Sequence, residues 1–307
     1  MTNKSSFVPE EQWPFQLVKS HLETRSLQTE NVWLGRIQPK YASKAAAFVK
    51  EYRSIQNEKL LHNQRLRRIQ KEGEPLILEV ILCPEAAMTR DQLEKILADR
   101  GIEAELSVFG VPAFPPLTEE QFSEWSKVWP VSFRRPVDRV EQLTNAQLGQ
   151  LDSVMDEVLR LARQQESSGN VPCAIAIYDL DNDTILSLQA DDRKNSGNPL
   201  HHAAIQGINN VAVKERERRM LDHDPKEERY LCTNLTAVMS HEPCVMCSMA
   251  LLHSRIHRLI YCSPQPSTGA MQSSYGIHWR TELNHRYLAY SNWKGKSAPK
   301  LDDSIHV

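Results

Sequence analysis

The strongest constraint on this chain is a pair of cysteines at the start of an apolar helix. Pro243 precedes Cys244, Cys247 follows, and an alanine- and leucine-rich run continues to Leu252. Proline favours the first turn of a helix, so both sulfur atoms are expected to point the same way from that turn. The free N–H groups and the helix dipole favour the thiolate, which is the form of cysteine that binds zinc. Two thiolates supply half of a tetrahedral site, so the fold has to bring further ligands to this helix start.

A second helix start offers a third ligand. A proline turn places His201 and His202 directly before a segment that is predicted to be helical. Zinc nucleobase deaminases carry H-x-E followed by P-C-x-x-C, in which one histidine and two cysteines hold the metal and the glutamate moves protons. His202, Cys244 and Cys247 fit the three ligand positions, and the register of the motif favours His202 over His201. Ala204 stands where the glutamate belongs.

These motifs resemble the cytidine-deaminase-like superfamily and, within it, the tRNA adenosine deaminases. The second motif of that family, E-P-C-x-M-C followed by A-x-x-H-S-R, stands intact from Glu242 to Arg255, and Leu283-Asn284-His285-Arg286 resembles a later family segment. Because Ala204 replaces the glutamate, the chain is most similar to the non-catalytic subunit of the eukaryotic heterodimeric tRNA wobble-adenosine deaminases. The resemblance covers about residues 144–290. It implies a zinc ion, a catalytic partner with an intact H-x-E site, and tRNA as the bound substrate.

Length and composition are compatible with two globular domains. The chain has 307 residues, 40% of them hydrophobic, and a net charge of −2. Residues 1–25 contain no secretory segment, so the six cysteines are expected to be reduced, with Cys83, Cys173, Cys232 and Cys262 buried in apolar strands. No apolar run approaches membrane-spanning length, so no membrane role is expected. Residence in the nucleus and the cytoplasm is the resulting expectation.

Residues 1–140 are predicted to form a smaller N-terminal α/β domain. Apolar patterns alternate in the order strand, helix, strand, helix, strand, at residues 31–38, 42–52, 76–83, 89–100 and 102–109. Thr89 is a suitable N-cap and Gly101 a suitable C-terminal glycine for the second helix. The candidate arrangement is ferredoxin-like. Residues 1–25 are either an ordered arm or a frayed tail, and the proline-rich stretch with Trp125 and Trp129 is expected to be a linker packed on a surface.

A basic run between the first helix and the second strand is a candidate RNA contact. Its positive residues are Lys59, Arg65, Arg67, Arg68 and Lys71. Such a cluster can neutralise RNA phosphates without sequence-specific geometry, and the resemblance to tRNA deaminases favours this interpretation. The alternatives are a solvated helix face, with Leu60, Leu66 and Ile69 packed inward, or a localisation signal. No aromatic residue interleaves the run, so base stacking is not expected there.

Residues 141–307 are predicted to form the second domain. A helix begins after Thr144 and ends before Gly169, and strands follow at residues 171–180 and 184–189. After the histidine helix come an exposed loop at residues 216–229, a strand at 230–239, the cysteine helix and a strand at 256–262. Helices that alternate with strands imply a sheet covered on both faces, with the two ligand-bearing helix starts at its edge. The resemblance supplies the cytidine-deaminase-like three-layer α/β/α fold.

The missing glutamate limits what this site can do. In an active deaminase zinc acidifies a bound water and the glutamate moves its proton, so Ala204 removes a group worth about 10²- to 10⁴-fold in rate. Glu242 belongs to the shared motif, and Glu215 and Glu217 lie several turns along the histidine helix, so none of them is expected to replace it. We therefore expect no catalytic residue in this chain and a structural zinc ion. Water, the Val307 carboxylate or His306 could complete the coordination.

The predicted function is that of a structural, tRNA-binding subunit of a heterodimeric deaminase that converts wobble adenosine to inosine. The catalytic partner would carry the intact H-x-E site. One alternative is an active zinc nucleobase deaminase with an unrecognised base, and another is a zinc-containing RNA-binding module without deaminase function. The apolar helix after Cys247, with Met249, Leu251 and Leu252, is either a subunit interface, as in the family, or ordinary core.

Overall fold

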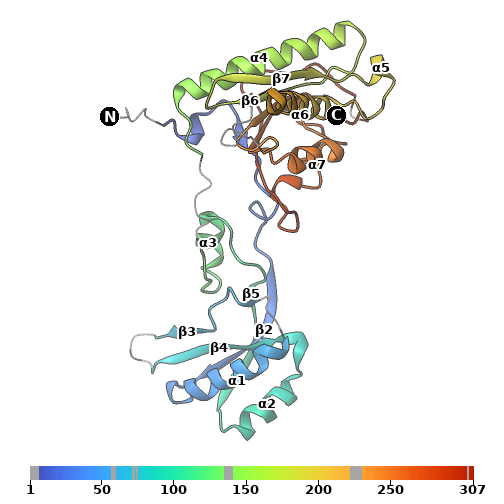
Figure 1. Cartoon of the computed structure of the whole chain (residues 1–307). Helices are drawn as coiled ribbons and strands as arrows, with labels where there is room; N and C mark the ends of the chain where they lie inside the picture. Colours follow the sequence, from blue (N-terminus) through green and yellow to red (C-terminus); the bar gives the residue numbers. More distant parts are fainter. Residues whose placement is uncertain are drawn as a thin grey trace. The chain divides into compact units, whose positions relative to one another are not determined.

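The chain folds into two compact units (Figure 1). The structure, a computed structural model, describes residues 7–56, 60–70, 73, 75–134, 141–221, 230–302 and 304–307. Residues 21–139 form the N-terminal unit, and residues 1–20 together with residues 140–307 form the C-terminal unit. Among the described helices, none combines the length and the apolar character that crossing a membrane requires.

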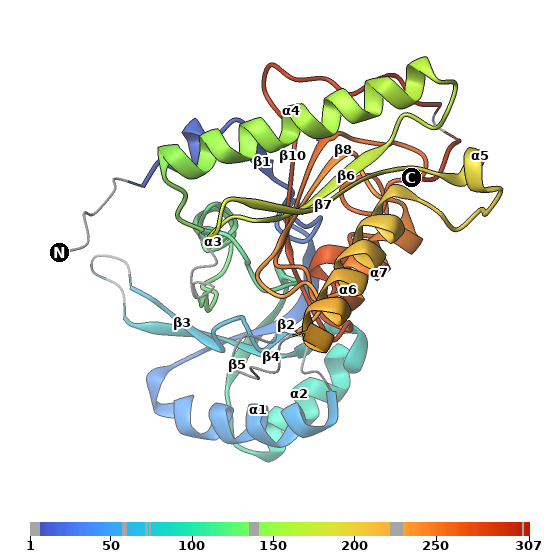
Figure 2. The same ribbon diagram turned by 45° about the horizontal axis from the view of Figure 1, so that its top comes forward.

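The N-terminal unit is a four-stranded antiparallel sheet with helices packed on one face (Figures 1 and 2). Its elements in chain order are β2 (Thr29–Ile37), α1 (Ala42–Gln56), β3 (Leu66–Ile69), β4 (Ile77–Pro84), α2 (Arg90–Asp99) and β5 (Ala104–Pro112). The strand order β3-β4-β2-β5 places the first and third of these strands in the middle. This is the ferredoxin-like arrangement, so the expected fold of this unit is confirmed.

Local sequence signals fix both ends of α2. The Thr89 side chain accepts a hydrogen bond from the Gln92 N–H, and the Gln92 side chain accepts one from the Thr89 N–H. This reciprocal capping box satisfies two N–H groups that a helix start leaves unpaired. Gly101 follows the last turn at φ 61°, a left-handed conformation that glycine adopts without strain. The expected helix is therefore confirmed at both ends.

Strand β3 contradicts the helical alternative for the basic run. Leu66–Ile69 pair antiparallel with residues 77–80 of β4. Leu66 packs against the core beneath the helices, while Arg68 is exposed. The helical alternative is therefore wrong for residues 66–69, because pairing with the neighbouring strand decides their conformation, and so short a run does not reveal this in its periodicity.

A row of alternating charges crosses this sheet on the face opposite the helices. Arg67, Glu79, Arg36 and Glu105 lie side by side on β3, β4, β2 and β5. The Glu79 side chain is 1% exposed and lies 2.6 Å from Nε of Arg67 and 2.9 Å from Nε of Arg36. Arg36 also lies 3.9 Å from Glu105. Opposite charges placed across neighbouring strands stabilise their pairing.

The proline- and tryptophan-rich stretch belongs to the N-terminal unit. α3 (Glu119–Trp125) begins at Thr118, whose side chain accepts a hydrogen bond from the Gln121 N–H. Trp129 is fully buried against side chains of β2, β4 and β5. Its indole N–H donates to the Gln64 carbonyl at 2.7 Å. The stretch expected to be a packed linker is thus part of the core of this unit.

The C-terminal unit has a six-stranded sheet between two layers of helices (Figure 2). The strand order is β1-β10-β9-β8-β6-β7. The strands are β1 (Gln16–Leu17), β6 (Ala174–Asp179), β7 (Thr184–Ala190), β8 (Thr236–His241), β9 (Arg258–Ser263) and β10 (Leu288–Ser291). α4 (Asn145–Ser167) covers one face, while α6 (Ala203–Leu221) and α7 (Val245–His253) cover the other. The expected three-layer α/β/α fold is therefore confirmed.

The N-terminal arm corrects the expected division of the chain, which assigned residues 1–140 to the first domain. β1 pairs antiparallel with β10. Trp13 and Phe15 are each 1% exposed, and their rings pack on Tyr290 at centroid distances of 5.8 Å and 5.3 Å. Burial of these aromatic rings stabilises the docking of residues 7–20 on the C-terminal unit, although the N-terminal unit is closer to them in the sequence. Residues 7–20 are thus an ordered arm of the C-terminal unit.

Several segments of the C-terminal unit differ from the expected ones. α6 continues to Leu221, past the start of the expected loop, because Glu215 pairs with Arg218 and Arg219 along one helix face. The rest of that loop, residues 222–229, lies outside the described residues. β8 begins only at Thr236, since the residues before it form a turn with positive φ angles. A short helix, α5 (Arg193–Ser196), and strand β10 have no counterpart among the expected elements.

Candidate metal centre

Three buried side chains converge where α6 and α7 begin. His202 immediately precedes α6, Cys244 is the N-cap of α7, and Cys247 lies in its first turn. The Nδ1 atom of His202 lies 3.7 Å from Sγ of Cys244 and 3.5 Å from Sγ of Cys247. Nitrogen and sulfur ligands of a tetrahedral zinc ion are about 3.5 Å apart, given the usual bond lengths. The donor atoms and their spacing therefore fit a zinc ion, and the described residues contain no other such cluster of three.

The two cysteines have opposed pKa shifts. The pKa of Cys244 is lowered, first by its hydrogen bond with Cys247 and, against the effect of burial, by its contact with His202. The pKa of Cys247 is raised well above its ordinary value by the same bond to Cys244 and by burial. The pair therefore shares one proton, which a bound metal would displace.

The remaining four cysteines are buried, as the sequence predicts. Burial raises the pKa of Cys83 to about 11 and that of Cys173 to about 12. Both are therefore neutral thiols near pH 7, which suits small apolar core residues and not reactive nucleophiles.

Ala204 is fully buried in the first turn of α6. Among the described residues, none of the nearby carboxylates joins the His-Cys-Cys group: Glu242 is bound by donors of a neighbouring loop, Glu215 pairs with Arg218 and Arg219, and Asp191 pairs with Arg193. The arrangement can hold a metal but offers no side chain to transfer a proton at it.

The alternative ligand His201 does not face the cysteines. Its Nδ1 atom lies 3.8 Å from a carboxylate oxygen of Asp192, in the loop before the helix. The structure thus brings His202 to the two sulfur atoms and leaves His201 half-buried beside that loop.

Residues 298–302 and 304–307 lie against the same site. Val307 is 1% exposed and belongs to the apolar cluster that contains both cysteines. Its main-chain oxygen accepts a hydrogen bond from the Cys244 N–H. Of the two residues considered for the fourth ligand position, Val307 therefore lies beside Cys244, whereas the side chain of His306 is exposed. This contact joins residues distant in sequence, and no local signal indicates it.

α7 is divided between core and surface. Leu251 and Leu252 are 0% and 4% exposed and belong to the core, so the core interpretation holds for them. Val245 is 39% exposed, and Met246 and Met249 are half-buried. Met246 and Met249 also pack against the core cluster, and we term the partly exposed side chains of these three residues the apolar strip of α7.

The structure separates the residues of the basic run. Arg67 is held by Glu79, and its guanidinium lies 4.3 Å from the ring centroid of Trp129. Arg68 is exposed and Arg65 is half-buried. Lys59 and Lys71 lie outside the described residues. Arg67 therefore has a clear role in the fold, which its charge in the sequence does not reveal.

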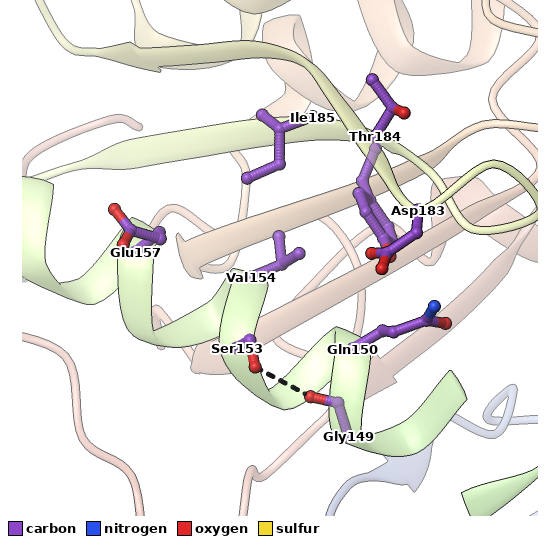
Figure 3. A pocket seen from close by; sticks show the side chains of 9 residues that line it. Gly149, Gln150, Ser153, Val154, Glu157, Asp183, Thr184 and Ile185 are labelled. Atoms are coloured by element: carbon purple, nitrogen blue, oxygen red, sulfur yellow. Dashed lines mark hydrogen bonds between the residues drawn. The ribbon is translucent and has the colours of Figure 1, made fainter. Parts of the chain in front are cut away.

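A separate groove of about 630 Å³ lies between α4 and the turn from β6 to β7 (Figure 3). Gly149, Ser153 and Val154 form the helix side, and Asp183 and Ile185 form the hairpin side. It contains no histidine or cysteine, and α4 covers the sheet face opposite the metal ligands. The groove is therefore not part of the candidate metal site.

Two family profiles match parts of the chain. Residues 149–263 match the cytidine and deoxycytidylate deaminase zinc-binding region, and residues 30–129 match the tRNA-specific adenosine deaminase TAD3 N-terminal domain. The three-layer fold and the buried His-Cys-Cys set are thus those of a domain similar to this deaminase zinc-binding region.

Relatives that match most of the chain identify its family more closely than the two profiles do. The chain is 52% identical to the tRNA-specific adenosine deaminase subunit tad3 of Schizosaccharomyces pombe, over 99% of this chain and 96% of that protein. It is 27% identical to subunit TAD3 of Saccharomyces cerevisiae, over 88% of this chain and 85% of that protein. It is 31% identical to the probable inactive tRNA-specific adenosine deaminase-like protein 3 of Homo sapiens, over 75% of each. The chain belongs to the TAD3 family of tRNA-specific adenosine deaminase subunits.

Proposed function

We propose that this chain is the non-catalytic, structural and tRNA-binding subunit of a heterodimeric tRNA adenosine deaminase that converts wobble adenosine to inosine. The observation that carries the proposal is Ala204. All three metal-ligand positions of the deaminase motif are filled, but a buried methyl group stands where active deaminases have the glutamate that transfers protons. Two relatives support it by name, one being a deaminase subunit and another a probable inactive deaminase-like protein.

The proposed role of zinc is structural. An ion held by His202, Cys244 and Cys247 would tie the start of α6 to the start of α7. When bound in an active deaminase, zinc lowers the pKa of a water molecule, and Ala204 offers no group to receive that proton. Removing the ion with a chelator should lower the melting temperature of the chain, and adding zinc should restore it, as measured by scanning fluorimetry. An unchanged melting temperature after complete removal contradicts the structural role.

The catalytic partner is proposed to carry an intact H-x-E site and to cover the apolar strip on α7. Val245, Met246 and Met249 support this surface, because they are apolar side chains that the described part of the chain leaves partly exposed.

Contact with tRNA is proposed for the N-terminal unit. Arg67 is held by Glu79, and among the described residues of the run Arg68 is the exposed one, so Arg68 would make the main phosphate contact, with Arg65, Lys59 and Lys71 adding positive charge nearby in the sequence. The same run could serve as a localisation signal, and we propose residence in both the nucleus and the cytoplasm.

Inosine formation on a tRNA with adenosine at the wobble position tests the function. The chain alone and the catalytic partner alone should both be inactive, and the mixture should be active. Activity of this chain alone would establish a hidden base and an active deaminase. Inactivity of the mixture, together with tRNA binding, would favour the RNA-binding module.

A further inference from the structure

Glu242 is a buried carboxylate that the metal ligand set does not use. It directly follows β8, two residues before Cys244, and is 0% exposed. One carboxylate oxygen accepts from the N–H groups of Met271 at 2.8 Å and Ser273 at 3.0 Å. The other accepts from the Gln265 N–H at 3.0 Å and the Ser273 hydroxyl at 2.5 Å. Four hydrogen bonds from these donors compensate for the burial of the carboxylate.

All of these donors belong to residues 264–274, which we term the support loop. The support loop packs directly on the cysteine turn: Gly269 forms a β-bridge with Cys244, and the Ala270 N–H donates to the Pro243 carbonyl at 3.0 Å. A Cβ atom at Gly269 would lie 2.3 Å from the carboxyl carbon of Glu242. The loop backbone therefore approaches the carboxylate more closely than any side chain would allow.

The support loop also holds residues 298–307. The Gln265 side chain donates to the Asp302 carbonyl at 3.0 Å, and the Thr268 hydroxyl donates to the Ile305 carbonyl at 3.0 Å. The segment then reaches Val307, which accepts from the Cys244 N–H. Through the support loop, the Glu242 carboxylate is thereby connected both to the turn that carries Cys244 and to residues 298–307.

We propose that Glu242 is a positioning residue for the metal site. It holds the support loop so that Cys244 is fixed for zinc binding and residues 298–307 stay in place. The claim that Glu242 fixes Cys244 for zinc binding rests on the zinc site proposed above. The claim that it keeps residues 298–307 in place rests on the hydrogen bonds alone. The position requires a carboxylate because every group that faces it is a donor. An amide would turn its own NH₂ group towards some of them and leave buried donors unpaired.

Glu242→Gln is the direct test, and the chain offers a matched control. Asp179 is another buried carboxylate of the C-terminal unit, 6% exposed, which accepts from the Asn182 N–H at 3.2 Å and the Asn182 side chain at 3.0 Å. Asp179→Asn therefore removes a buried carboxylate outside the support loop. Ser273→Ala removes only the hydroxyl donor and keeps Glu242. It therefore provides a milder test of the same hydrogen bonds if Glu242→Gln fails to fold.

The first measurement is zinc release from the full chain to a chromogenic chelator, at a temperature where circular dichroism shows every variant folded. Glu242→Gln should release zinc about 10- to 100-fold faster than the wild type, as expected when a group supporting a ligand is lost. Ser273→Ala should be intermediate, and Asp179→Asn should match the wild type. Equal release from Glu242→Gln and wild type overturns the proposal, as does equal acceleration in Asp179→Asn.

The second measurement is amide hydrogen exchange of residues 298–307, which should become faster in Glu242→Gln and Ser273→Ala only. If the wild-type chain holds no zinc, the proposed zinc site fails, and this exchange still decides the role of Glu242. Inosine formation by the wild-type chain alone would overturn the proposed function and leave both measurements on Glu242 unchanged.

Discussion

At the scale of single residues, two buried carboxylates organise their surroundings through different partners. Glu79 accepts from the guanidinium groups of Arg36 and Arg67, whereas Glu242 accepts from N–H and hydroxyl groups. In the sequence Glu242 is visible as part of the family motif and Glu79 as a lone acid within an apolar stretch, but neither pattern shows which groups each carboxylate binds. The partners decide what is lost when the charge is removed.

Glu79→Gln should lower the free energy of unfolding by about 1–3 kcal/mol, because Arg36 and Arg67 lose the charge that they share. Urea unfolding followed by tryptophan fluorescence measures the loss. Glu94→Gln is the matched control, since its ion pair with Arg90 is exposed on both sides and is screened by water, so its loss should change the free energy of unfolding much less. Equal losses in the two variants would show that burial of Glu79 adds nothing.

At the scale of elements, helix α4 has one weak position. Gly149 lies inside this 23-residue helix, and a Cβ atom there would meet nothing within 4 Å. Gly149→Ala should therefore stabilise the C-terminal unit by about 0.5–1 kcal/mol and raise its melting temperature by about 2–4 °C. Scanning calorimetry measures the shift. Gly269→Ala, at a position with no room, should lower the melting temperature, and a decrease for Gly149→Ala would contradict the prediction.

Glu141 links three elements of the C-terminal unit. It lies just before α4 and accepts from Arg258, the first residue of β9, at 2.6 Å and from His257, which precedes it, at 2.9 Å. It also accepts from the hydroxyl of Tyr290 in β10 at 3.1 Å. Burial raises the pKa of this carboxyl, but the hydrogen bond from His257 and the charge of Arg258 outweigh it, so that the pKa falls below its ordinary value of 4.5. The folded unit therefore favours the ionised form.

This lowered pKa predicts a pH dependence. The stabilisation by Glu141 is present above the ordinary value of 4.5 and is lost as the pH falls through the folded-state pKa. Glu141→Gln should lower the melting temperature at neutral pH and weaken its decline between about pH 5 and about pH 3. Scanning fluorimetry of both proteins across this range tests the prediction. Parallel curves would show that Glu141 does not contribute to the acid sensitivity.

At the scale of the whole molecule, the sequence predicts those features of the fold that depend on residues within one helical turn of each other. The caps at Thr89 and Thr144 and the two ligand-bearing helix starts follow from such local patterns. Strand β3 depends on pairing with the next strand, and strand β10 and the N-terminal arm depend on pairing with segments further along the chain. The role of Arg67 likewise becomes visible only when β3 lies beside Glu79. The periodicity of such short segments is too weak to predict which strand or side chain they will pair with.

The assignment of the arm to the C-terminal unit predicts which unit Trp13 stabilises. Trp13→Ala should destabilise the C-terminal unit by about 3–5 kcal/mol and leave the N-terminal unit unchanged, because the ring is fully buried beside Tyr290. Hydrogen exchange of α4 and α2 reports on the two units separately. Trp33→Ala, in the core of the N-terminal unit, should show the opposite pattern. Faster exchange in α2 after Trp13→Ala would contradict the assignment.

The pairing of β1 with β10 also bears on how the chain folds during synthesis. The N-terminal unit is inserted between β1 and α4, so all of its strands have left the ribosome long before Leu288–Ser291 are made. Until then, Trp13 and Phe15 lack the aromatic partners that bury them. Exposed apolar segments that wait for distant partners are prone to aggregate. We therefore expect the arm to stay exposed during synthesis, whereas all strands of the inserted unit are available to pair before β10 is made.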